Sequence, residues 1–195
     1  MTRLRLVLWV LVGFAAIGAI SLVLQTRSPT VRETSLGTIG GPFTLTGSDG
    51  KPFSSAKLNG RPAAIFFGFT HCPDVCPTTL ARLVKLRRQL GQGDDGLSIV
   101  FISVDPERDG PAEVGSYAGL FNAPVVGLTG SPADIERVKK QFGVFSAKAP
   151  LPGGGYSVDH TATVFLMDRN GAFVATLSPQ ESDAVALEKL RRLAA

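Results

Sequence analysis

Residues 63–77 read AAIFFGFTHCPDVCP, an apolar run that leads into a loop containing both cysteines of the 195-residue chain. The run from Ala63 to Phe69 is continuous and apolar, which is typical of a central strand buried on both faces. Residues 78–90 then place apolar side chains at helical spacing with basic ones between them, which predicts an amphipathic helix. Cys72 and Cys76 are therefore expected at a strand-to-helix junction.

The elements predicted on either side of this junction alternate between strands and helices. In chain order they are a hairpin over 43–53 around Asp49-Gly50, the strand over 63–69, the helix over 78–90, a buried strand over 97–104, a helix over 112–121, a short strand over 125–128, a helix over 131–142 capped by Ser131, a Pro/Gly loop over 148–155, a hairpin over 162–177 around Asn170-Gly171, and a terminal helix over 181–193. This order predicts an α/β fold in which helices flank a mixed sheet.

The N-terminal region is predicted to anchor the chain in a membrane. The 19 residues from Leu6 to Leu24 carry no charge, and a spanning helix needs about 20 apolar residues. Arg3 and Arg5 precede the run, which favours a cytoplasmic N-terminus. A cleaved signal peptide is the alternative, but its apolar region usually has about 7–15 residues and a small-x-small cleavage site. We expect an anchor over residues 1–25, a linker over 26–39 and one domain over 40–195.

The net charge of +4 lies mostly near the N-terminus, because residues 1–33 carry +3 and the remainder only +1. A nearly neutral domain gives no support for nucleic-acid binding, despite the basic composition of the whole chain. An exported domain lies where thiols tend to be oxidised. Its two cysteines are then a structural bridge, a redox pair or a metal site.

The spacing of the cysteines favours the metal site without excluding the redox pair. Thioredoxin-type centres place two residues between their cysteines, whereas three residues separate Cys72 from Cys76. The wider gap allows two sulfurs to open around an ion and still permits a disulfide. The positive end of the helix is expected to lower the thiol pKa below its usual value of about 8.5. Two thiolates favour a soft ion, above all Cu(I).

The chain has two histidines, and they have different expected roles. His71 directly precedes Cys72, and adjacent side chains of an extended segment point apart, so we expect it to support the site instead of binding the ion. His160 lies just before the predicted strand over 162–167, which can pair with the strand over 63–69. A lone histidine is usually a hydrogen-bonded residue. Cys₂His₂ zinc would also need His71, so His160 fits a three-ligand copper site better.

Three separated motifs closely resemble the SCO/SenC family. They are GFTHCPDVCP at 68–77, SVDPERD at 103–109 and YSVDH at 156–160, and the resemblance runs from about Gly40 to Leu190. It implies a thioredoxin-like fold on a membrane tether, facing the periplasm or the mitochondrial intermembrane space. The short N-terminus, without a transit peptide, favours a bacterial inner membrane crossed once, with the soluble domain in the periplasm.

The same resemblance implies the ligands, the cargo and the partners. The family's copper ligands correspond here to Cys72, Cys76 and His160, holding Cu(I), with Cu(II) as a second oxidation state. The family acts in assembly of the copper A centre of cytochrome c oxidase, by delivering copper, by reducing the cysteines of the recipient, or both. The expected partners are the oxidase subunit that carries copper A, other periplasmic copper chaperones and thiol reductants.

Several alternatives stay open at this stage. The protein is either a copper chaperone without turnover or a thiol-disulfide oxidoreductase, in which Cys72 attacks a disulfide and Cys76 resolves the intermediate. The sequence leaves open whether it is an enzyme. A peroxiredoxin-like activity is disfavoured, because the resemblance requires threonine where Pro73 stands.

The second motif and two flanking residues also allow more than one role. The loop over 104–109 either flanks the site, as loops at the carboxyl ends of strands do, or supplies Asp109 as a helix cap. Asp159 either orients His160 or shapes its loop. Met167 is expected in the core, where its sulfur does not bind copper.

Overall fold

The computed structural model of the chain describes Trp9 and residues 39–194. The predicted membrane anchor and nearly all of the predicted linker lie outside these residues. Within the described part of the chain, no helix combines the length and the apolar character that a membrane crossing requires.

A seven-stranded mixed sheet forms the centre of the domain, in the order β2-β1-β5-β4-β3-β8-β9. Strands β3, β4 and β5 are parallel to one another, and β8 pairs antiparallel with β3. The mixed α/β fold predicted from the sequence is therefore confirmed, including the pairing of β8 beside β3. The strands of this sheet are β1 (Thr44–Gly47), β2 (Pro52–Ser54), β3 (Ala63–Gly68), β4 (Ser98–Ser103), β5 (Val126–Thr129), β8 (Val164–Met167) and β9 (Phe173–Leu177).

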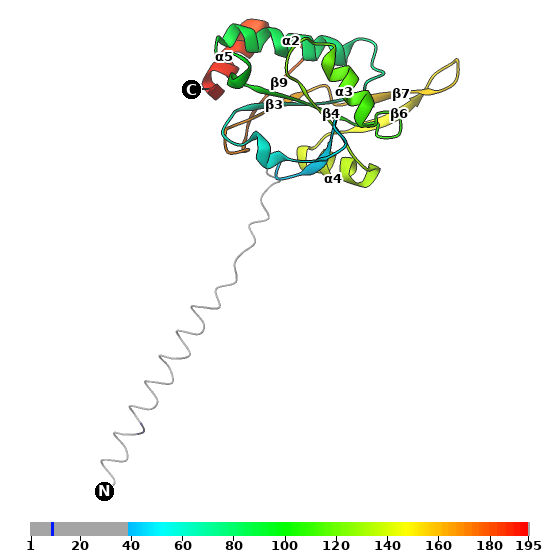
Figure 1. Ribbon diagram of the computed structural model, residues 1–195, viewed down its shortest axis with the longest axis horizontal. Helices are drawn as coiled ribbons and strands as arrows, with labels where there is room; N and C mark the ends of the chain where they lie inside the picture. The colour runs from blue at the N-terminus through cyan, green and yellow to red at the C-terminus, as the bar shows by residue number, and fades with distance from the viewer. Residues whose placement is uncertain (1–8, 10–38, 195) are drawn as a thin grey trace. The chain divides into compact units, whose positions relative to one another are not determined.

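Helices cover both faces of the sheet, and Figure 1 shows α2 and α5 over one face and α4 over the other. The helices are α2 (Val75–Leu90), α3 (Pro111–Gly119), α4 (Pro132–Phe142) and α5 (Asp183–Ala194), with short 3₁₀ helices at Ser55–Leu58 and Asp94–Gly96. Helix α4 begins as predicted, because the Ser131 side chain accepts a hydrogen bond from the amide of Asp134. It ends at Gly143, whose φ of 65° suits glycine.

The core is built around β3, in which all six residues are buried. Phe66 and Phe67 on β3 and Phe101 on β4 are all fully buried. Burying a side chain of this size contributes about 1.5–3 kcal/mol. The loop that leaves the carboxyl end of β3, with both cysteines, is therefore attached to the most firmly packed strand of the domain.

The structure corrects the interpretation of residues 148–155 as a loop. Strands β6 (Ser146–Pro150) and β7 (Tyr156–His160) form an antiparallel hairpin, and only the residues between them turn. The segment SAKAP lacks the β-branched and aromatic residues that identify strands, and a proline within a run argues against one. Pro150 is tolerated because it lies at the end of β6, which pairs only with β7 among the described strands.

Candidate metal centre

The two cysteines lie on the loop and first helical turn that follow β3. The side chain of Cys76 is fully buried, whereas Cys72 is half-buried and opens towards the surface. The amide of Cys76 donates a hydrogen bond to the sulfur of Cys72 over 3.4 Å, so one of the free N–H groups in the first turn of α2 faces this sulfur. Both thiols are free in the structure.

Gly68, the last residue of β3, leaves the space in which the Cys76 sulfur lies. A β-carbon at this position would stand 2.8 Å from the Cys76 sulfur and 3.0 Å from the ring of Phe101. These separations are shorter than van der Waals contact, so any other residue would displace its neighbours. The glycine of the first motif therefore has a direct role in placing the second sulfur.

His160 approaches the cysteines from the end of β7. Its Nδ1 lies 3.1 Å from the carbonyl of Thr161, and its ring is edge-on to Phe66 and Phe69 at centroid separations of 5.9 and 5.8 Å. A proton on Nδ1 is then donated to the carbonyl, which leaves the lone pair of Nε2 available to an ion. Nε2 lies 3.4 Å from the Cys76 sulfur.

The structure brings Cys72, Cys76 and His160 together, with their donor atoms all within 4.8 Å of one another. Sheet topology explains the convergence: β8 is antiparallel to β3, with Val164 opposite Phe66, so the residues before β8 reach the carboxyl end of β3. Donors bound to one zinc ion lie about 2.0–2.3 Å from it, which places them roughly 3.5–4 Å apart. The observed separations require only a small contraction around an ion of that size.

The type of donor indicates which ion would fit. Two sulfurs and one imidazole nitrogen suit a soft ion such as Cu(I). Structural zinc sites almost always have four protein ligands. Among the described residues, no further Cys, His, Asp or Glu joins this group. His71 is exposed and its Nδ1 lies 3.5 Å from a carboxylate oxygen of Asp109, so it is not the fourth ligand of a zinc site.

Burial shifts the pKa values of two candidate ligands, Cys76 and His160, and it overturns one expectation. Burial raises the pKa of the Cys76 thiol well above its ordinary range, so the lowering predicted from the helix terminus is wrong for this cysteine. Burial also lowers the pKa of His160. At neutral pH the imidazole is therefore neutral and ready to bind, whereas Cys76 must lose its proton to a metal.

The loop between β4 and α3 flanks the site, and the alternative role of Asp109 as a helix cap is wrong. The N-terminal residue of α3 is preceded by Gly110 without a side-chain cap. The buried Asp109 carboxylate instead accepts hydrogen bonds from the Thr70 amide and hydroxyl, at 2.8 and 2.6 Å, and from the Ser103 hydroxyl at 2.6 Å. Because Thr70 lies just before the cysteines, Asp109 fixes the start of their loop to β4.

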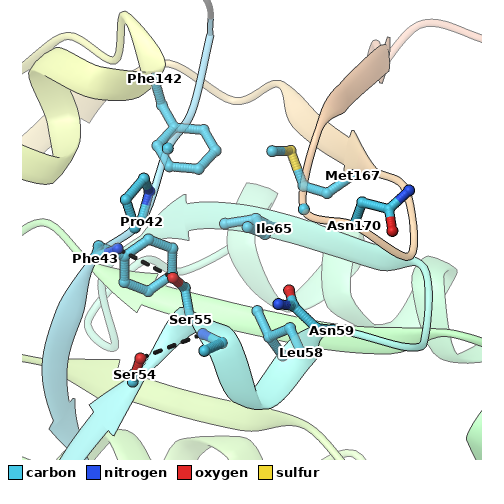
Figure 2. Close-up of a pocket in the computed structure, with 13 residues that line it drawn as sticks. Pro42, Phe43, Ser54, Ser55, Leu58, Asn59, Ile65, Phe142, Met167 and Asn170 are labelled. Carbon is cyan, nitrogen blue, oxygen red and sulfur yellow. Dashed lines mark hydrogen bonds between the residues drawn. The ribbon is translucent and has the colours of Figure 1, made fainter.

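Two further expectations concerned Asp159 and Met167. Asp159 is exposed, and Nδ1 of His160 is occupied by the carbonyl of Thr161, so the carboxylate does not orient the ring through that nitrogen. Met167 is buried as predicted, with 4% of its surface exposed. It lines a cavity of about 200 Å³. Figure 2 shows its thioether near Phe142 and Ile65, and the lining of this cavity contains none of the three candidate ligands.

Sequence reasoning missed Arg108 and Tyr156 as neighbours of the site. The Arg108 guanidinium lies 3.8 Å from the centroid of the Tyr156 ring and donates a 2.8 Å hydrogen bond to the Tyr156 carbonyl. Arg108 belongs to the motif at 103–109 and Tyr156 to the motif at 156–160. Membership of these motifs was the one signal in the sequence that could have identified them. Their contact joins positions 48 residues apart, which no local pattern reveals.

Comparison with known proteins shows which family the chain resembles. A sequence model of the family described as SCO1/SenC matches residues 31–195. A solved structure described as Bradyrhizobium japonicum ScoI with copper bound is 44% identical and superimposes with a TM-score of 0.72, covering 80% of this chain and 99% of that one.

Relatives of similar sequence occur in both eukaryotes and bacteria. The mitochondrial protein SCO2 of Saccharomyces cerevisiae is 34% identical over 87% of this chain, and the aligned region spans 58% of the yeast protein. The SCO2-like protein RC0895 of Rickettsia conorii is 33% identical over 97% of this chain and 95% of its own length.

Proposed function

The chain belongs to the SCO1/SenC family, and on that premise we propose that it carries one copper ion on Cys72, Cys76 and His160. The observation that carries this proposal is the convergence of two sulfurs and one imidazole within 4.8 Å at the carboxyl end of β3. The copper-bound state of a relative 44% identical to this chain supports the choice of ion. The recipient that we propose is the copper A centre of cytochrome c oxidase.

Transfer is expected to proceed by ligand exchange. Cys72 is half-buried and is the more accessible thiol, whereas Cys76 is fully buried next to Gly68. A thiolate of the recipient therefore approaches from the side of Cys72. Protonation of Cys76 is expected to favour release of the ion, because the raised pKa of this thiol means that it readily regains its proton once the ion leaves.

The location of the protein is also part of the proposal. An uncharged run over residues 6–24 follows two arginines, which favours a single-pass inner-membrane protein with its N-terminus in the cytoplasm and residues 40–195 in the periplasm. This arrangement places the site on the same side of the membrane as other periplasmic copper chaperones and thiol reductants.

The direct test is a Cu(I) titration of the reduced protein against a competing chelator of known affinity. One ion is expected to bind per chain. Cys72→Ala and Cys76→Ala should each weaken binding by about 10³-fold or more, and His160→Ala by about 10- to 100-fold, because two thiolates supply most of the affinity for a soft ion. Met167→Leu is the control, since it removes a sulfur outside the site. Wild-type affinity in His160→Ala would contradict the three-ligand site.

Thiol-disulfide exchange is a second candidate, because the two thiols differ in exposure as an attacking and a resolving cysteine do. The Cys72 thiolate would attack a partner disulfide, forming a mixed disulfide and freeing one partner thiol. Cys76 would then attack the Cys72 sulfur, which forms the Cys72–Cys76 disulfide and releases the partner as a dithiol. The raised pKa of Cys76 disfavours rapid resolution, so we place copper binding first. Trapping of a copper-independent mixed disulfide in Cys76→Ala, with normal exchange in His160→Ala, would favour this alternative.

A further inference from the structure

The hairpin that carries His160 is attached to the domain in an unusual way. Within residues 39–194, β6 and β7 pair with each other and with no strand of the main sheet. Backbone hydrogen bonds to the central strands therefore do not hold His160 in place. The ligand depends on side-chain contacts between its hairpin and neighbouring elements.

The polar contacts of this kind come from one short loop, residues 104–110 between β4 and α3. Arg108 donates from Nη1 to the Tyr156 carbonyl over 2.8 Å, and the Tyr156 hydroxyl donates to Asp105 over 2.9 Å. Lys148 of β6 donates to Glu107 over 2.5 Å. Apart from the contacts of His160 with Cys76 and with the Thr161 carbonyl, these are the side-chain hydrogen bonds that join residues 146–160 to the rest of the described domain.

Arg108 is the central member of this group. Its Nε donates to the buried carboxylate of Asp105 over 2.5 Å, which fixes the guanidinium within its own loop. Its planar face lies 3.8 Å from the centroid of the Tyr156 ring and 5.8 Å from that of Phe69. Phe69 in turn packs edge-on against His160, with an interplanar angle of 86°. Arg108 thus contacts the hairpin directly and packs on the ring that contacts the candidate ligand.

The same loop also holds the other half of the site. Asp109, the next residue, binds the amide and hydroxyl of Thr70 at the start of the cysteine loop. The loop over residues 104–110 therefore forms hydrogen bonds with both segments that supply donors to the ion, the cysteine loop and the β6–β7 hairpin. Two neighbouring side chains of opposite charge therefore bind the two segments: Asp109 binds Thr70 before the cysteines, and Arg108 binds Tyr156 on the hairpin that carries the histidine.

We infer that Arg108 is a positioning residue that holds His160 in line with Cys76, with Tyr156 as its contact on the hairpin. The inference rests on the proposed function, because positioning matters only if His160 binds copper. A guanidinium provides a rigid fork and a flat face together, and a lysine ammonium provides neither. Loss of Arg108 is therefore expected to affect the histidine ligand and leave the dithiol in place.

The first test is a double-mutant cycle for Cu(I) affinity in the full chain. Arg108→Ala should weaken binding by about 10-fold in the wild-type background and leave affinity unchanged in the His160→Ala background. Arg108→Lys should give a smaller loss, and it serves as a second variant because Arg108→Ala removes a partner of buried Asp105. Arg137→Ala, in an exposed ion pair on α4, is the control. An equal loss in both backgrounds would overturn the inference.

A second measurement does not require copper. In the metal-free protein, nuclear Overhauser effects between the His160 and Phe69 rings should be present in the wild type and in Arg137→Ala, and weakened or absent in both Arg108 variants. Their persistence in folded Arg108→Ala would overturn the inference whatever copper does. Loss of these effects, together with wild-type copper binding by His160→Ala, would instead retain the positioning role and reject the three-ligand site.

Discussion

The two halves of the candidate site are supported in different ways. The cysteine half follows β3, which has hydrogen-bonded strands on both sides and six buried residues. The histidine half lies at the end of a hairpin that is paired only with itself among the described strands. The first half directly follows the central strand of the core. The second is attached through side chains, by polar contacts from residues 105–108 and by the packing of Val158 and the His160 ring on the core.

This difference suggests separate roles for the two halves: the cysteines retain the ion, and the histidine detaches when the ion is released. Elements with many buried contacts open only with the whole domain, whereas elements with few open locally at a lower free energy. A dithiol in the core is therefore expected to keep a constant geometry while the imidazole detaches. Such an arrangement suits a carrier, because the ion can pass through a two-sulfur state that is accessible to an incoming thiolate.

The largest effect is expected from copper itself, which would connect the two halves. Cu(I) at 1,000 times its dissociation constant should stabilise the folded protein by about 4 kcal/mol. Amide exchange should slow most in residues 146–160, because this hairpin has no strand pairing with the main sheet and is expected to open locally without copper. Thermal unfolding and hydrogen exchange, with and without Cu(I), measure both quantities. In His160→Ala the additional protection of the hairpin should disappear, and uniform protection in the wild type would argue against separate halves.

The next largest effect is expected from Gly68→Ala in the cysteine half. The new β-carbon would lie 2.8 Å from the Cys76 sulfur and close to two aromatic rings. Overpacking of this kind typically costs about 1–3 kcal/mol, and it should also weaken Cu(I) binding by moving a donor. Urea unfolding and a chelator titration test the two parts. Gly119→Ala is the matched control, because its β-carbon would meet nothing within 4 Å. Unchanged stability would show that the core half is less rigid than proposed.

Residues that are rare or strongly patterned were predictable from the sequence. The chain has two cysteines and two histidines, so few ligand sets were possible, and the long apolar run of β3 identified the central strand. Met167 in the core and Ser131 at the start of α4 were predicted for the same reason, since a local pattern determines each of them.

Features that depend on tertiary packing were not predictable. The pKa of Cys76 is raised because its sulfur is buried, and the sequence showed only its place at a helix terminus. Strand β6 was missed because its pairing with β7, not its own composition, makes it a strand. The link from Arg108 to Tyr156 likewise exists only once the hairpin has folded over the loop after β4.

A smaller effect is expected from the same type of substitution in the histidine half. Gly155 lies in the turn of the β6–β7 hairpin with a φ of +75° and open space around it. Gly155→Ala should cost about 1 kcal/mol, because an L-residue avoids this conformation. The cost should appear as faster amide exchange in the hairpin and a few-fold loss of Cu(I) affinity, with little change in global unfolding. Gly153→Ala, which has open space and no such φ, should be neutral. A loss of global stability equal to that of Gly68→Ala would contradict the comparison.

The smallest effect is expected far from the ligands, where α2 is held to α5. Asp183 accepts hydrogen bonds from Lys85 and Arg82, each over 2.8 Å, and these contacts lower the pKa of its carboxyl below the ordinary 3.8. A lowered pKa in the folded state stabilises the fold above pH 3.8, and this contribution is lost as the pH falls through the lowered value.

Asp183→Asn should therefore be slightly less stable than the wild type at pH 7, and the difference should shrink as the pH falls below 3.8. Urea unfolding of both proteins between pH 7 and 2.5 measures this difference. Glu188→Gln, in an exposed pair with Arg192 on the same helix, controls for loss of a surface charge. Copper affinity should stay unchanged in both variants, because the partners of Asp183, Arg82 and Lys85, lie beyond the first turn of α2, which carries Cys76. A pH-independent difference would mean that Asp183 acts through packing, and a change in copper affinity would mean that the cysteine half extends along α2 beyond its first turn.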